Sequence, residues 1–182
     1  MPNENTTRRI LDSAKASFLC NGYEATSLKT VCKQAGVTTG AFYHRFAGKY
    51  ELYRSVVEPA VAKLFAMLDD CVETADSPGM PEAWLDLVYL YWDEFRITVQ
   101  CRCTPYYKEF CSALESRIFQ LLFHSSDKAE HEQDFAWLLS KAYLNGFLEV
   151  VRCDYDFDMA KNCILMLEQF LVQRKSAPAD WR

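Results

Sequence analysis

Apolar residues recur every three or four positions along most of this chain, which is the period of an α-helix with one buried face. The first such stripe, in residues 7–21, consists of Ile10, Leu11, Ala14, Phe18 and Leu19. The alternation of apolar and polar residues that marks a β-strand is missing, and the six Gly and six Pro fall mostly between stripes. The pattern predicts an all-α protein of about nine helices.

Glycine and hydroxyl residues mark the ends of the first two predicted helices. The first helix is expected to end at Gly22, because glycine readily adopts the left-handed backbone of a helix C-cap. Thr26 or Ser27 is expected to cap the N-terminus of the second helix, and Gly36 makes the turn that follows it.

A short third helix and a long fourth helix follow the glycine turn. Thr38 or Thr39 is expected to cap the third helix, which is predicted to run to Phe46. The fourth helix is predicted to begin at Lys49. Because Pro59 removes one backbone hydrogen bond and crowds the preceding turn, we expect a kink or a break near Glu58.

Five further helices are predicted in the rest of the chain, at about 82–95, 96–102, 105–123, 129–151 and 157–174. No stretch approaches the ~18 uninterrupted apolar residues of a membrane-spanning helix. The polar N-terminus also lacks the apolar run of a secretory signal. We therefore expect a cytoplasmic protein that does not bind membranes.

Charge is unevenly distributed along the chain. The net charge of −5 argues against a protein that coats nucleic acid indiscriminately. Residues 1–58 contain eight Lys/Arg against five acidic residues, a balance of +3, whereas residues 59–182 contain twelve against twenty, a balance of −8. A mildly basic head on an acidic body suits a protein that touches phosphate at one end only. We predict two domains, residues 1–58 and residues 59–182.

The segment from Thr26 to Lys49 contains the predicted second helix, glycine turn and third helix, and its exposed side carries hydroxyl groups, an aromatic ring and basic groups. In a helix-turn-helix unit the first helix crosses the DNA backbone, and the second presents its N-terminal residues to base edges. A three-helix module that binds protein, or nothing, would give the same pattern, and the residues alone leave both interpretations open.

Residues 7–58 also resemble the N-terminal domain of the TetR (tetracycline-repressor) family of bacterial transcriptional regulators. The matching elements are Ile10-Leu11-Asp12-Ser13-Ala14, Phe18, Asn21-Gly22-Tyr23-Glu24-Ala25-Thr26-Ser27, Val31, Gln34-Ala35-Gly36-Val37-Thr38, Gly40-Ala41-Phe42-Tyr43, Phe46, and Lys49 followed by Glu51-Leu52. The resemblance implies a three-helix DNA-binding domain, followed by a helical domain that forms the dimer and holds a small-molecule pocket.

The resemblance also implies which residues contact DNA. They are Thr26, Ser27, Lys29, Thr38, Thr39, Gly40, Tyr43, His44 and Lys49. The family usually has histidine directly before the last phenylalanine of this motif, where this chain has Arg45. Arginine can bind phosphate or guanine through two hydrogen bonds, so we add Arg45 to the expected contacts.

The helices after the predicted boundary are rich in aromatic residues, which suits a largely apolar ligand pocket. The expected pocket residues are Phe65, Leu68, Trp84, Val88, Tyr91, Trp92, Phe95, Tyr106 and Phe110. An ordinary core would give the same pattern. Asp93 and Glu94 hint at a cationic ligand, although charged residues usually face water.

The last two predicted helices are the candidates for a dimer interface. The expected residues are Leu139, Tyr143, Gly146, Phe147, Val150, Cys163, Leu167 and Phe170. The small residues Ala142 and Gly146 lie four positions apart and would let two helices approach closely. The alternative is that these residues form the core of a single chain.

Eight cysteines occur at spacings that make no disulfide framework. We expect most of them to be small buried hydrophobic residues. Cys101 and Cys103 lie close together, but on a helix, residues two apart point in different directions, and no His cluster lies near them. We therefore expect no metal and no cofactor.

The pattern as a whole predicts a regulator. No Gly-rich phosphate loop or nucleophile elbow is present, so we do not expect an enzyme. We predict a homodimeric repressor that binds a palindromic DNA operator and is released by a small hydrophobic or aromatic effector. Control by a protein partner, or by cysteine redox or metal chemistry, is the alternative.

Overall fold

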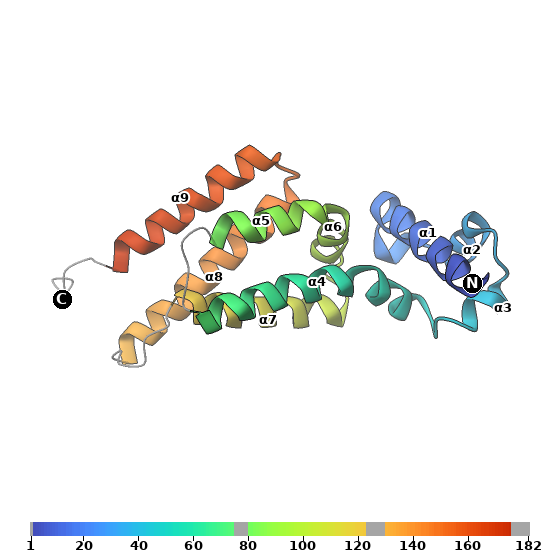
Figure 1. Ribbon diagram of the computed structural model, residues 1–182, viewed down its shortest axis with the longest axis horizontal. Coiled ribbons are helices and arrows are strands. Elements are labelled where there is room, and N and C mark those ends of the chain that lie inside the picture. Colours follow the sequence, from blue (N-terminus) through green and yellow to red (C-terminus); the bar gives the residue numbers. More distant parts are fainter. Residues whose placement is uncertain (1, 75–79, 123–129, 176–182) are drawn as a thin grey trace. The chain divides into compact units, whose positions relative to one another are not determined.

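The computed structural model describes residues 2–74, 80–122 and 130–175 of the 182-residue chain. Nine helices and no strand occur in these ranges, so the all-α prediction is confirmed. The helices are α1 (Pro2–Ala25), α2 (Leu28–Ala35), α3 (Thr39–Tyr43), α4 (Lys49–Thr74), α5 (Met80–Leu90), α6 (Trp92–Gln100), α7 (Pro105–Leu122), α8 (Glu130–Arg152) and α9 (Phe157–Lys175) (Figure 1). None of these helices is long and apolar enough to cross a membrane.

Most predicted helices are present, but two boundary predictions were wrong. α3 ends at Tyr43 instead of Phe46. The break expected between residues 95 and 96 lies at Tyr91, whose backbone (φ −115°, ψ 37°) separates α5 from α6. Apolar residues continue on both sides of Tyr91, so the periodicity did not reveal this break. α4 runs through Pro59 as one helix, so the break is absent, and the alternative of a kink near Glu58 stays a prediction.

The contacts divide the chain into two compact units. Unit 1 comprises residues 1–63 and 91–108, and unit 2 comprises residues 64–90 and 109–182. Helix α1 packs against both α2 and α6, so α6 belongs with the N-terminal helices. The boundary proposed from the sequence, between residues 58 and 59, falls inside α4 and stays a prediction.

Unit 1 is built around buried aromatic and aliphatic side chains. Tyr53 is fully buried, and its ring lies 6.0 Å from Phe18, 5.2 Å from Tyr23 and 5.9 Å from Tyr106, measured between centroids. Burying such rings stabilises the fold by removing apolar area from water. The start of α7, which carries Tyr106, is therefore part of the core of the head.

Unit 2 has a separate aromatic core. The ring of Trp84, on α5, lies 5.7 Å from that of Tyr143 and 4.6 Å from that of Phe147, both on α8. Helix α9 packs against α5 and α8. At Gly146 the approach of α9 is close, because a Cβ added there would lie 2.7 Å from Cδ2 of Leu167.

Candidate nucleic-acid interface

The turn between α2 and α3 depends on Gly36. This residue is left-handed (φ 62°, ψ 41°), a conformation that is strained for residues with a Cβ. The N–H groups of Gly36 and Val37 donate to the carbonyls of Lys33 and Cys32 at 3.2 and 2.9 Å, which closes the end of α2. The predicted glycine turn is confirmed.

Helix α3 contains only five residues and is fixed at both ends. Thr38 caps it, because its hydroxyl oxygen accepts a hydrogen bond from the N–H of Ala41 at 3.1 Å. Phe42 and Phe46 are buried and anchor the inner side of the segment in the core. The opposite side of α3, which carries Thr39 and Tyr43, is therefore exposed to solvent.

Seven of the ten predicted DNA-contacting residues are exposed. They are Ser27, Lys29, Thr38, Thr39, Gly40, Tyr43 and His44. Tyr43 is 60% exposed, which is unusual for a large ring. They lie at the start of α2 and along α3, the two elements of the predicted helix-turn-helix unit. We call this set the polar face.

Thr26 does not belong to the polar face. Its side chain is buried, and its hydroxyl lies 3.0 Å from the carbonyl oxygen of Ser17 and 2.7 Å from that of Gly22. A hydroxyl group has one proton to donate, so it is satisfied inside the fold. We therefore reassign Thr26 to holding the connection between α1 and α2.

Arg45 and Lys49 are half-buried and bind protein oxygens. The Arg45 guanidinium donates to Thr7 Oγ1 at 3.2 Å and to the carbonyl of Ala41 at 2.9 Å. Lys49 Nζ donates to the carbonyl of Glu24 at 2.8 Å and lies 4.7 Å from the ring centroid of Tyr23. Both cations therefore brace the head, and contact with phosphate remains a prediction for them.

The structure also places a cation that the sequence analysis missed beside the turn. Nη2 of Arg9, on α1, donates to the carbonyl of Gly36 at 3.3 Å. Arg9 is exposed and precedes Gly36 by 27 positions. Helical periodicity places Arg9 on a polar side of α1 but gives no sign of which segment that side meets.

The predicted pocket residues fall into two groups. Phe65, Leu68, Trp84, Val88 and Phe110 belong to unit 2, whereas Tyr91, Trp92, Phe95 and Tyr106 belong to unit 1. Within unit 2 the buried Nε1 of Trp84 has no hydrogen-bond partner. An unpaired buried N–H is costly, and in a native structure it calls for an explanation such as a bound group. A single pocket made of all nine residues stays a prediction.

The acidic pair on α6 faces a cation from the protein itself. Lys15 Nζ lies 3.2 Å from Oδ2 of Asp93 and 3.0 Å from Oε1 of Glu94. The suggestion that these carboxylates mark a cationic ligand in the aromatic pocket is therefore replaced by an ion pair between α1 and α6.

Most of the predicted dimer residues fill the interior of their own chain. Leu139, Tyr143, Phe147 and Val150 are buried, and Trp84 covers the rings of Tyr143 and Phe147. Gly146 approaches Leu167 of the same chain, Cys163 is partly buried, and the side chain of Phe170 lies outside the described residues. The intramolecular alternative explains these contacts better.

The cysteines are less buried than expected. Only Cys32 and Cys101 are buried, whereas Cys20, Cys103 and Cys153 are exposed. Cys101 and Cys103 lie at and beyond the end of α6, not on one helix. Burial raises the pKa of the Cys101 thiol to about 11, which disfavours the thiolate that metal binding and oxidation require. The described residues contain no cluster of His, Cys, Asp and Glu that would hold a metal ion.

Known protein sequences match the segment of the chain that carries the polar face. Residues 10–56 match the family model described as "Bacterial regulatory proteins, tetR family". The HTH-type transcriptional regulator UidR of Escherichia coli K12 is 35% identical over 52 residues, which cover 29% of this chain and 26% of UidR. The matched part thus spans about a quarter of that relative's length.

Solved structures extend the similarity to the rest of the fold. A transcriptional regulator from Aquifex aeolicus VF5 superposes with a TM-score of 0.67 at 24% identity, over 91% of this chain and 99% of its own. NalD, the secondary repressor of the MexAB-OprM multidrug efflux pump in Pseudomonas aeruginosa, gives a TM-score of 0.61 at 21% identity over the full length of both chains. At these identities the likeness shows a shared fold.

Proposed function

Because the N-terminal domain of this chain belongs to the TetR family of bacterial regulatory proteins, we propose that the protein is a DNA-binding transcriptional regulator, acting as a homodimeric repressor that an effector releases. The observation that carries the proposal is the polar face. Its hydroxyl, imidazole, phenol and ammonium groups lie exposed on α2 and α3, while Phe42 and Phe46 hold α3 in place from inside. Polar groups on a rigid support are what DNA recognition requires.

The members of the polar face have different roles in this proposal. Lys29 and the hydroxyls of Ser27 and Thr38 bind phosphate and set the register of the protein on DNA. Thr39 and Tyr43, on the outer side of α3, reach base edges in the major groove. Arg45 and Lys49 act mainly by orienting α3 and the start of α4.

Tyr43→Ala tests the polar face. Loss of the ring should weaken binding to the operator by about tenfold or more, because a good contact to a base edge contributes about 1–3 kcal/mol. The operator is first located by footprinting on the DNA that flanks the gene encoding this protein. The matched control is Leu90→Ala, since Leu90 is also highly exposed but belongs to unit 2. Unchanged operator affinity of the Tyr43 variant would remove this ring from the interface.

Lys29→Gln tests the phosphate contact separately. The variant should bind all DNA sequences more weakly, and the slope of log affinity against log salt should fall by about one. A change confined to one operator sequence would instead assign Lys29 to base recognition.

We assign the dimer interface to the outer sides of α8 and α9. Exposed positions recur at helical spacing on α8 (Leu138, Ala142, Asn145) and on α9 (Met159, Asn162, Met166). Leu138 is 61% and Met166 is 71% exposed, and apolar area of this kind favours a protein partner. A twofold dimer would carry two heads to half-sites about 34–36 Å, or a multiple of that distance, apart on DNA.

We assign the effector site to the aromatic core of unit 2. The supporting observation is Trp84, whose buried N–H lacks an acceptor while its ring lies against Tyr143 and Phe147. An effector with a flat apolar body and one hydrogen-bond acceptor would satisfy this group. Release from DNA then requires that the effector bind the two states with different free energies, typically by about 1–3 kcal/mol.

Trp84→Phe tests this assignment, because it keeps an aromatic ring but removes the N–H. A small-molecule library is screened for compounds that raise the melting temperature of the wild-type protein and release it from its operator. The Phe variant should bind such a compound about tenfold more weakly and keep its operator affinity when no compound is present. Equal affinity of both proteins would place the effector elsewhere.

A further inference from the structure

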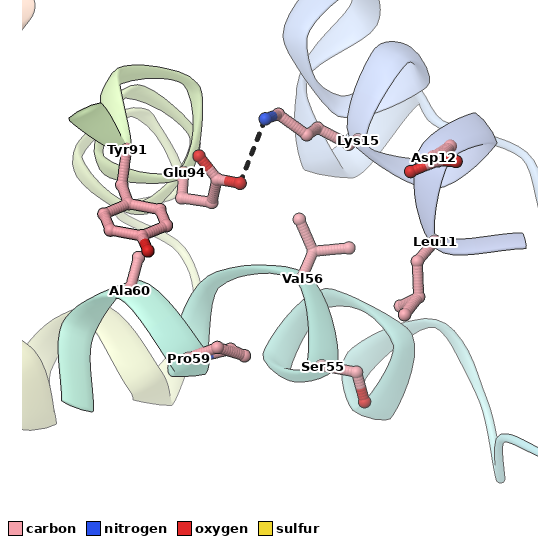
Figure 2. Close-up of a pocket in the computed structure, with 9 residues that line it drawn as sticks. All are labelled: Leu11, Asp12, Lys15, Ser55, Val56, Pro59, Ala60, Tyr91 and Glu94. Atoms are coloured by element: carbon pink, nitrogen blue, oxygen red, sulfur yellow. Dashed lines mark hydrogen bonds and ion pairs between the residues drawn. The ribbon is translucent and has the colours of Figure 1, made fainter. Parts of the chain in front are cut away.

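Unit 1 contains a cavity of about 200 Å³ between α1, α4 and α6 (Figure 2), and none of its lining residues belongs to the polar face. Its apolar wall consists of Leu11 from α1 and Val56, Pro59 and Ala60 from α4. Figure 2 shows Val56 near the centre and the ring of Tyr91 above Ala60. An apolar cavity of about 150 Å³ accepts benzene, so this space can take one small hydrophobic group.

The polar lining of the cavity is rich in hydrogen-bond acceptors. Asp12 and Glu94 contribute carboxylates. Pro59 has no N–H, so the carbonyl of Ser55 lacks the hydrogen bond that an α-helix would otherwise give it. The Ser55 hydroxyl donates to the carbonyl of Glu51 at 2.9 Å, so its proton is used and its oxygen can accept.

Negative charge exceeds positive charge around the cavity. Lys15 is shared between Asp93 and Glu94, at 3.2 and 3.0 Å. Asp12 has only a 4.0 Å contact with Arg8, and both of these side chains are largely exposed, so that pair contributes little. Three carboxylates therefore share one well-paired ammonium group. An anionic ligand would have to displace the partners of Lys15 and lie beside Asp12.

Lys63, a cation next to the cavity, contacts Tyr91 and not a carboxylate of the lining. Lys63 Nζ hydrogen-bonds the hydroxyl of Tyr91 and lies 4.4 Å from the centroid of its ring. This contact holds Tyr91 from α4, while Glu94 stays paired with Lys15 and Asp12 keeps only its 4.0 Å contact with Arg8.

We propose that the cavity binds a small primary amine that carries one hydrophobic group. The ammonium group donates to the carboxylate of Asp12, whose own contact with Arg8 is 4.0 Å long, because an ammonium has three donors and no acceptor. The hydrophobic group lies against Val56 and Ala60. This site is additional to the effector site in unit 2, and it lies on α1 and α4 of the DNA-binding head.

Benzylamine and benzyl alcohol are the matched probes, because they share a ring and differ in charge. Binding to the full-length protein is measured by saturation-transfer NMR and calorimetry at neutral pH, without DNA. Benzylamine should bind, and benzyl alcohol should bind at least about fivefold more weakly. Equal affinities, or no binding of benzylamine, would overturn the proposal. Because DNA is absent, neither result bears on operator binding.

Ala60→Leu tests the location of the site by filling the cavity. Ala60 is buried and lines the cavity, whereas Ala62 on the same helix is exposed. Benzylamine binding should be lost in Ala60→Leu and kept in Ala62→Leu. Retained binding in an Ala60→Leu variant that melts cooperatively would place the amine elsewhere.

Asp12→Asn tests the charge without disturbing the core, because Asp12 is exposed. Benzylamine should bind about fivefold more weakly to this variant, while benzyl alcohol should be unaffected. Asp86→Asn, an exposed change in unit 2, is the control. Equal benzylamine affinity of the Asp12 variant and the wild type would contradict the proposed orientation of the ammonium group.

Discussion

The two compact units of this chain present different surfaces to their surroundings. Among the described side chains, unit 1 exposes one large hydrophobic residue, Tyr43. Unit 2 exposes Leu90, Trp137, Leu138, Met159 and Met166, at 43–74% of their area. The head therefore completes its core within itself, whereas unit 2 leaves apolar area uncovered.

This difference indicates what each unit binds. A surface of hydroxyl and basic groups with a single ring suits a polar, charged polymer such as DNA. Exposed Leu, Met and Trp side chains on helices suit another protein surface, because aromatic residues and Met are enriched at the cores of interfaces. The predictions below test this contrast.

The largest expected effect is on the free energy of unfolding, and it distinguishes a buried from an exposed tryptophan of unit 2. Trp84→Ala should lower the free energy of unfolding by about 3–5 kcal/mol, because it leaves a cavity beside Tyr143 and Phe147. Trp137→Ala should lower it by only about 1 kcal/mol, since Trp137 is 43% exposed and its ring contacts mainly Phe119 and Lys141. Urea unfolding of both variants measures the difference. Similar losses would mean that Trp137 is buried in solution, for instance by a second copy.

The next largest effect is on the stability of the proposed dimer, through the exposed apolar residues of unit 2. Leu138→Lys and Met166→Lys should each weaken the dimer by about 2 kcal/mol, because a charge would enter its interface. Sedimentation equilibrium over a range of concentrations measures this. Tyr43→Ala, the change at the exposed ring of unit 1, should leave the dimer intact. A dimer that tolerates both lysines would need another interface.

Replacing the glycine of the left-handed turn in unit 1 should have a smaller effect on the free energy of unfolding. Gly36→Ala should destabilise the protein by about 1–2 kcal/mol, because alanine resists the left-handed conformation and its Cβ would meet the Arg9 guanidinium. Gly48→Ala is the control, since Gly48 has open space and no positive φ. Urea unfolding compares the two. If both cost the same, the turn is not the constraint we describe.

The smallest effect concerns the ion pair between α1 and α6. Burial acts to lower the pKa of Lys15, but hydrogen bonds and negative charge from Glu94 and Asp93 outweigh it and raise the pKa above the ordinary 10.5. The stabilisation is therefore fully present below pH 10.5 and is lost as the pH rises through the higher pKa of the folded state. A partly exposed pair of this kind contributes about 0.5 kcal/mol.

Lys15→Met isolates this contribution. The difference in unfolding free energy between wild type and variant should be present at neutral pH and shrink above pH 10.5. Lys29→Met, at an exposed lysine, should show no such change. A difference that is constant with pH would mean that lost packing, not charge, explains the effect of the Lys15 variant.

Much of the fold was predictable from the sequence because helical periodicity and caps are local. Gly36 makes the turn and Thr38 caps α3, as predicted, whereas Gly22 interrupts α1 with φ 74° and ψ 169°, which is not the left-handed C-cap expected there, and α1 continues to Ala25. The partner of each helix was not predictable. An apolar stripe shows which side of a helix is buried but not what covers it, so Trp84 and Phe147 were assigned to a pocket and to a dimer interface although they contact each other.

The candidate site was predictable to the extent that its residues are exposed. The exceptions, Thr26, Arg45 and Lys49, share one physical cause: a hydroxyl or a cation that can donate to a phosphate oxygen can also donate to a backbone carbonyl. All three donate to such carbonyls here. Only the folded chain determines which oxygen is nearer.

The brevity of α3 has a consequence for how this segment would behave alone. Five residues form little more than one helical turn, and isolated helices shorter than about 12–15 residues are marginal in water. The rest of unit 1 therefore holds α3 in its helical conformation, through the Thr38 cap, the buried Phe42 ring and the hydrogen bonds of Arg45. A synthetic peptide of residues 37–47 would carry the same side chains and remain a random coil.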